Sequence, residues 1–220
     1  PAASERRFTL ALSDVGEIYF LPVLMPALAT EAPGVTLRVV PLALPDLAEA
    51  MAAGEVDLAL GSLPGLQSGF YQQALLRQRY VCLMRDGHPG AARRLTRAAF
   101  AGFDHVRVEA LGTGHGRVDE ALARAGLARR IRLSVPNFVA LGHVLRSTDL
   151  MATVPERLAE RVGAPLGLLT RPLPVRLPSP EIHQLWHATR HRDSGHQWLR
   201  AFIARLFADA PAARVRVNGR

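Results

Sequence analysis

A chain of 220 residues with 49% hydrophobic and 21% charged residues has the balance of an ordinary globular protein, which excludes disorder over most of its length. Its single cysteine excludes an internal disulfide, no apolar run reaches the roughly 18 residues that span a bilayer, and the amino terminus lacks a secretory stretch, so we expect a cytoplasmic protein. The net charge of +8, from 27 arginines and no lysine against 19 acidic residues, suits nucleic-acid binding, but only 6% of the residues are aromatic.

The beginning of the chain alternates between strand and helix patterns. Residues 8–12 alternate in polarity, which predicts a strand, and Ser13 or Asp14 then stands where a helix cap belongs. The opening turns of the following helix are expected to be irregular, because Pro22 and Pro26 interrupt it. The next predicted elements are a strand, a helix and a strand, at residues 35–42, 45–51 and 56–61.

The rest of the chain repeats this alternation. Residues 75–84 predict one longer strand. Further strands are predicted at residues 105–109, 131–135, 150–154 and 182–188, and helices at residues 95–100, 116–125, 138–146, 156–162 and 197–207. A proline-rich passage at residues 165–180 carries no predicted element, and the tail from residue 208 to residue 220 is expected to be frayed.

Two α/β units in tandem, with one strand and one helix left over, predict an α/β protein of two lobes. Lobe I is expected to be discontinuous, with residues 1–77 and 184–220, and lobe II to span residues 78–183. The crossing segments would lie near residues 75–84 and 182–188. Open α/β sheets bind ligands at the carboxyl ends of their strands, so we expect a small-molecule site in the cleft between the lobes.

A set of short segments carries a more specific signal: Phe8–Pro22, Gly54–Gly61, Arg79–Cys82, Gly87–Pro89, Thr113–Gly116, Val135–Phe138, Ser147–Leu150 and Ala152–Pro155. Together they resemble the effector-binding domain of LysR-type transcriptional regulators, over about residues 8–207. Within that family they are most similar to the branch that responds to salicylate and nitroaromatic breakdown products, near the nodulation regulators.

The resemblance implies a type 2 periplasmic-binding-protein fold with an aromatic-acid cleft between two lobes. It also implies a homodimer through these domains, a tetramer of the full-length protein, and an activator role in aromatic catabolism. DNA would be bound only through an amino-terminal winged helix-turn-helix, which we expect to be absent from this chain because no helical segment of sufficient length precedes Phe8. No cofactor, metal or membrane partner is implied.

Four candidate site residues stand near helix starts. The Ser13 hydroxyl is expected either to cap a helix or to contact a ligand, or to do both. Tyr19 and Phe20 stand where an aromatic side chain is either core or, as the resemblance implies, part of the pocket wall. Arg157 follows Val154–Glu156 at a helix start, where a cation is unfavourable unless an anion binds there; its planar fork suits a carboxylate, and the resemblance places the effector at this position.

Other candidates rest mainly on the resemblance. It implies that His115, in a glycine-rich loop, faces the effector and that Phe138 and Ile182 supply apolar walls. Gln78 and Asn137 are departures, because salicylate-type members carry histidine at both positions, and a neutral amide cannot become cationic. These two departures argue against salicylate itself and leave a related aromatic acid, or a less acidic aromatic compound, as equal alternatives.

Two further patterns admit ordinary explanations. His183, His187 and His191 recur at four-residue spacing, as metal ligands can, but no nearby carboxylate or cysteine completes a set, so structural roles are favoured. Cys82, between Val81 and Leu83, is expected to be buried and inert. No nucleophile motif, zinc motif or cysteine pair supports an enzyme.

We therefore interpret the chain as the effector-sensing domain of a LysR-type regulator. One alternative is a stand-alone cytoplasmic small-molecule binding protein of the same fold. Another is a nucleic-acid-binding module that uses the arginines at positions 93, 94, 97, 129, 130 and 132, which would bind DNA with a steep salt dependence.

Overall fold

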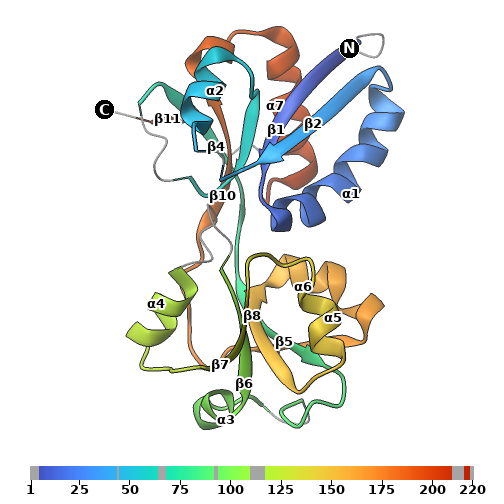
Figure 1. The fold of residues 1–220 in the computed structure, drawn as a ribbon. Helices are drawn as coiled ribbons and strands as arrows, with labels where there is room; N and C mark the ends of the chain where they lie inside the picture. The colour runs from blue at the N-terminus through green and yellow to red at the C-terminus, as the bar shows by residue number, and fades with distance from the viewer. Residues whose placement is uncertain are drawn as a thin grey trace. The chain divides into compact units, whose positions relative to one another are not determined.

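The computed structural model describes residues 5–43, 45–63, 68–91, 94–109, 117–209 and 216–218. The chain divides into two compact units (Figure 1). Unit 1 consists of residues 1–77 and 181–220, and unit 2 of residues 78–180. The second boundary thus lies at residue 181, where the sequence suggested residue 184.

Unit 1 is built on one mixed sheet with the strand order β11-β4-β10-β3-β1-β2. The strands are β1 (Arg6–Leu12), β2 (Val35–Pro41), β3 (Leu58–Gly61), β4 (Phe70–Arg77), β10 (Glu181–His187) and β11 (Arg216–Asn218). Strand β1 pairs in parallel with β2 and β3, whereas β10 runs antiparallel to both β3 and β4. The carboxyl ends of β1 to β4 and the amino end of β10 therefore share one edge of the sheet.

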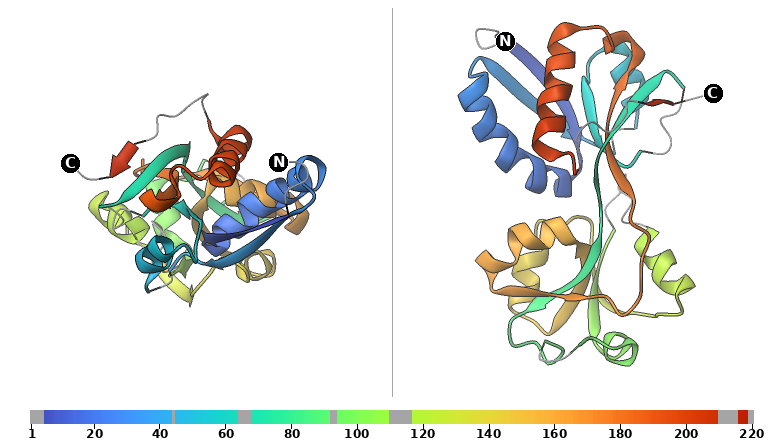
Figure 2. Two further views of the ribbon diagram at one scale, coloured as in Figure 1. Left: turned by 90° about the horizontal axis from the view of Figure 1, so that it is seen from above. Right: turned by 180° about the vertical axis from the view of Figure 1, so that it is seen from behind.

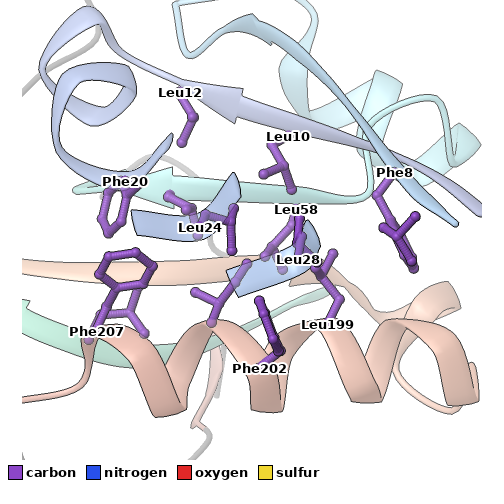
Figure 3. Close-up of a cluster of buried hydrophobic side chains, with 14 of the residues drawn as sticks. Phe8, Leu10, Leu12, Phe20, Leu24, Leu28, Leu58, Leu199, Phe202 and Phe207 are labelled. Carbon is purple, nitrogen blue, oxygen red and sulfur yellow. The ribbon is translucent and has the colours of Figure 1, made fainter. Parts of the chain in front are cut away.

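Helices cover both faces of this sheet. On one face, α1 (Asp14–Glu31) and α7 (Ser194–Phe207) enclose a core of large apolar side chains (Figures 2 and 3). The short helix α2 (Leu47–Ala53) buries Leu47 and Met51 in a second cluster with Ala59 and Leu185. The 3₁₀ turn η3 (Ala188–Arg190) connects β10 towards α7.

Helix α1 is continuous through both of its prolines, so the expectation of irregular opening turns was wrong. Its buried residues Phe20, Leu24 and Leu28 recur every four positions and face the sheet and α7 (Figure 3). Burying three large side chains contributes several kcal/mol, which offsets the backbone hydrogen bonds that the prolines remove.

Unit 2 has a five-stranded sheet with the order β7-β6-β8-β5-β9. The strands are β5 (Tyr80–Arg85), β6 (Asp104–Val108), β7 (Arg130–Val135), β8 (Leu150–Pro155) and β9 (Leu168–Pro172). Strand β6 is parallel to β7 and β8, whereas β5 is antiparallel to β8 and β9. The carboxyl ends of β6, β7 and β8 thus meet the amino end of β5.

The helices of unit 2 lie on both sides of its sheet (Figure 1). One side carries α3 (Arg97–Gly102) and α4 (Arg117–Arg124), whose apolar residues cluster with Cys82, Met84 and Met151. The other carries α5 (Leu141–Arg146), α6 (Glu156–Val162) and the 3₁₀ turn η2 (Ala164–Leu166). Cys82 is fully buried, as predicted.

Three predicted elements need correction. The single strand at residues 75–84 is two strands, β4 and β5, separated by Gln78 and Arg79, because its two halves pair in different sheets. Strand β9 lies inside the proline-rich passage, where it pairs with β5. The tail is not frayed throughout, since Arg216–Asn218 forms β11 against β4.

Candidate functional site

Most candidate residues of unit 2 gather at one edge of its sheet. Arg157 follows β8, Asn137 and Phe138 follow β7, and Gln78 precedes β5. These positions adjoin one another because the carboxyl ends of β6, β7 and β8 share an edge with the amino end of β5. This edge is where open α/β sheets bind their ligands.

Arg157 lies in the first turn of α6 and is partly exposed. The preceding residue, Glu156, donates its backbone N–H to the Arg79 carbonyl oxygen at 2.9 Å, which ties the start of α6 to the segment before β5. The helix has no side-chain cap, since Pro155 occupies the cap position. Its first turn therefore lacks a side-chain cap and carries a cation, a combination that favours an anion.

The neighbours of Arg157 at this edge differ in burial. Gln78 is 9% exposed, and its backbone N–H donates to the Pro180 carbonyl oxygen at 2.9 Å. Phe138 is buried just before α5. Asn137 is exposed, and its Oδ1 accepts a hydrogen bond from the Val139 backbone N–H at 3.1 Å. The Asn137 side chain thus stabilises a local turn, whereas Gln78 is buried at the edge of the sheet.

In unit 1, Ser13 and Ile182 lie at the corresponding edge. Ser13 follows β1 and caps α1, because its Oγ accepts the Gly16 backbone N–H at 3.1 Å. Ile182 stands near the amino end of β10, opposite Leu76, at a register shift between β10 and β4. The cap predicted for Ser13 is confirmed, and a second contact from its partly exposed hydroxyl is compatible with that cap.

The two aromatic candidates of α1 have different environments. Phe20 is 3% exposed and meets Phe207 of α7 edge-on, with ring centroids 4.8 Å apart (Figure 3). Tyr19 is partly buried and packs edge-on against Phe20, with centroids 5.0 Å apart. Phe20 therefore belongs to the core of unit 1 and supports Tyr19. His115 lies outside the described residues.

His183 also lies at the edge of the unit 1 sheet that carries Ser13 and Ile182, which the sequence did not predict. Its register partner on β3 is Gly61, the last residue of that strand, and its Nε2 lies 3.6 Å from Glu181 Oε2. The pairing of a late strand with β3 has no local sequence signal. The other two histidines of the series have structural contacts: His187 with Thr189, and His191 with Trp186. Among the described residues no three His, Cys, Asp or Glu side chains converge as a metal site.

A buried polar network occupies unit 1 away from this edge. Asp57, just before β3, accepts the Thr9 backbone N–H at 2.8 Å through Oδ2, and its carbonyl oxygen accepts from His196 Nε2 at 2.7 Å. Arg200 donates to His196 Nδ1 at 2.8 Å. Burial lowers the pKa of His196 to about 4, so the ring is neutral. Asp57 thus has a structural partner that the sequence did not name.

Comparison with known families and proteins identifies the chain. The model of the LysR substrate binding domain matches residues 2–208. The chain belongs to that family. Its two-lobed α/β fold is thereby confirmed, and it agrees with the regulatory domain of MexT, a transcriptional activator in Pseudomonas aeruginosa, at a TM-score of 0.81 and 30% identity over 92% of this chain and all of that one.

Curated relatives of this LysR-type domain are regulators of transcription. It is 50% identical to the HTH-type transcriptional activators NagR of a Ralstonia species and NahR of Pseudomonas putida, over 96% and 95% of this chain and 70% of each relative. These names support a regulatory role rather than an enzymatic one. No helix among the described residues is long and apolar enough to cross a membrane.

Proposed function

We propose that this LysR-type effector-binding domain senses a small aromatic carboxylate of the salicylate or benzoate class. The observation that carries the proposal is Arg157 in the uncapped first turn of α6, at the edge where β6, β7 and β8 end. A guanidinium at a helix start without a side-chain cap suits a carboxylate, and charge-assisted hydrogen bonds are among the stronger ones.

The other contacts belong to the same proposal. Gln78 fixes the orientation of the acid through its amide, and Phe138 supplies apolar surface from the same edge. From unit 1, Ser13, Tyr19 and Ile182 contribute hydroxyl and apolar contacts, with Phe20 behind Tyr19. His115 and Asn137 complete the proposed set. No covalent chemistry is involved.

Regulation follows from differential affinity. An effector that binds one conformational state of the domain better than another shifts the equilibrium between them by that difference. In the full-length regulator this bias would pass through a homodimer of these domains, within a tetramer, to amino-terminal DNA-binding domains and so to transcription activation.

The test compares acids with their neutral amides. The melting temperature is measured with salicylate and salicylamide, and with benzoate and benzamide. In at least one pair the acid should raise the melting temperature and the amide should not, because a ligand that binds the folded state stabilises it. Calorimetry with the active acid then compares Arg157→Ala with Arg161→Ala, an exposed arginine one turn later on α6.

The expected result is a loss of about 1.5–3 kcal/mol of binding free energy in Arg157→Ala, the contribution of a charge-assisted hydrogen bond, and little change in Arg161→Ala. Equal affinity of the two variants would remove Arg157 from the site. An amide that shifts the melting temperature as much as its acid would refute the carboxylate as the recognised group.

A further inference from the structure

On the face of the unit 2 sheet that packs against α3 and α4, four side chains with lone pairs lie close together. Cys82 Sγ and Met151 Sδ are 3.5 Å apart, on the neighbouring strands β5 and β8. Cys82 pairs in register with Thr153, and Met151 pairs in register with His105 of β6. Directly paired residues project from the same face of a sheet, so these four form one contiguous group.

Two atoms of this group are buried without a hydrogen-bond partner. They are Thr153 Oγ1 and His105 Nδ1, in residues that are 1% and 0% exposed. Leaving a buried polar atom unpaired destabilises a folded protein. Two such atoms beside a pair of sulfur atoms therefore point to something that pairs with them.

His105 has the arrangement of a metal ligand. Its Nε2 lies 2.7 Å from the Phe100 carbonyl oxygen, which can only accept, so Nε2 carries the proton and Nδ1 presents a lone pair. Ligand histidines are commonly oriented by such a bond from the other ring nitrogen to a carbonyl.

We propose that Cys82, Met151 and His105 form a buried site for monovalent copper, with Thr153 beside it. Thiolate, thioether and imidazole are the donors that Cu⁺ prefers, and a site closed to water suits the reduced ion. The thioether of Met151 supplies the central donor of this site.

Charge is balanced in this site. Cu⁺ replaces the thiol proton of Cys82, so the copper thiolate is neutral and the proton leaves to solvent. The nearby Arg129 guanidinium is buried and paired with Asp119, so its own charge is offset.

The test is anaerobic transfer of Cu⁺ from its bicinchoninate complex to the 220-residue chain, both folded and refolded from urea in the presence of the complex. We expect transfer of one equivalent, a loss of at least a hundredfold in affinity in Cys82→Ala, and a loss of at least tenfold in Met151→Leu. Met51→Leu is the matched control, because Met51 is a fully buried methionine of unit 1 that packs in the cluster with Leu47.

Each alternative outcome overturns the site. Absence of transfer, even on refolding, would mean that other groups, such as an internal water, satisfy Thr153 and His105. Equal transfer to wild type and Cys82→Ala would assign the copper to surface histidines. Transfer that requires Cys82 but is unchanged in Met151→Leu would reduce the proposal to a lone thiol. Met151→Leu conserves volume, and circular dichroism checks that it folds.

Discussion

His105 and His196 are buried in different units, yet their rings make the same kind of hydrogen bond. In each, Nε2 lies 2.7 Å from a carbonyl oxygen, that of Phe100 or of Asp57, and burial lowers the pKa of each ring to about 4. At neutral pH the folded protein therefore buries no charge at either ring. Protonation of either ring would bury a charge and destabilise the fold.

This predicts a stability that depends on pH below neutrality. Both folded-state pKa values lie below the ordinary value of about 6.5, so the unfolded chain takes up protons first as the pH falls. The free energy of unfolding should be constant above about pH 7 and fall by about 1–2 kcal/mol per histidine by pH 5. Urea denaturation at pH 7.5 and 5.0 measures this fall, and His196→Gln should reduce it. Equal free energies at the two pH values would contradict the prediction.

A second prediction at the residue scale concerns effector choice. If Gln78 sets the preference, Gln78→His should tighten salicylate binding, because an imidazole that becomes cationic adds a charge-assisted hydrogen bond to the carboxylate. Calorimetry with salicylate measures the gain. Asn137→His is the comparison, since the Asn137 amide is exposed and bonded to its own turn. No gain in Gln78→His would place the selectivity at another residue.

Among the elements, α1 shows how packing overrides local preference. Two interior prolines disfavour a helix, and the sequence therefore predicted irregular turns, but the buried series Phe20, Leu24 and Leu28 holds the helix against the sheet and α7. Leu24→Ala should lower the free energy of unfolding by about 2–5 kcal/mol through lost contacts and a cavity.

Met25 provides the control for that prediction. It is the next residue and is 46% exposed, whereas Leu24 is fully buried. Met25→Ala should change the free energy of unfolding by less than about 0.5 kcal/mol. Chemical denaturation of both variants decides the point, and similar losses in the two would show that the helix is not held by its buried face.

Local patterns predicted those elements whose signals are local. The alternation in β1, the glycine that ends α2 and the apolar run of β3 are visible in sequence. The break at Gln78 is not, because the residues on either side are equally suited to strands and only their partners differ. Strand β9 was missed for the opposite reason, since prolines surround a segment whose pairing with β5 makes it a strand. At the candidate site, Arg157 and Ser13 had local signals, whereas the position of His183 depends on a pairing between distant segments.

At the scale of the whole molecule, the two units differ in how the chain builds them. Unit 2 is one continuous stretch, residues 78–180, and contains every strand of its sheet. Unit 1 needs β10, which stands between β3 and β4 and comes after unit 2 in the chain. We therefore predict that residues 78–180 fold alone, whereas residues 1–77 do not.

Circular dichroism and the cooperativity of urea unfolding test both fragments. The fragment of residues 78–180 should show a single cooperative transition, and the fragment of residues 1–77 should show none, because its sheet lacks the strand that joins β3 to β4. Cooperative unfolding of residues 1–77 would contradict the central role given to β10.

The late position of β10 has a consequence for the protein during its synthesis. Helix α1 and strands β1 to β4 leave the ribosome well before residues 181–187 are translated, so their apolar faces remain without the strand that completes their sheet. For that interval the nascent chain presents unpaired strand edges to its surroundings while the middle of the chain is already able to fold. Translation rate and chaperone supply should therefore govern the yield of this domain more strongly than its final stability does.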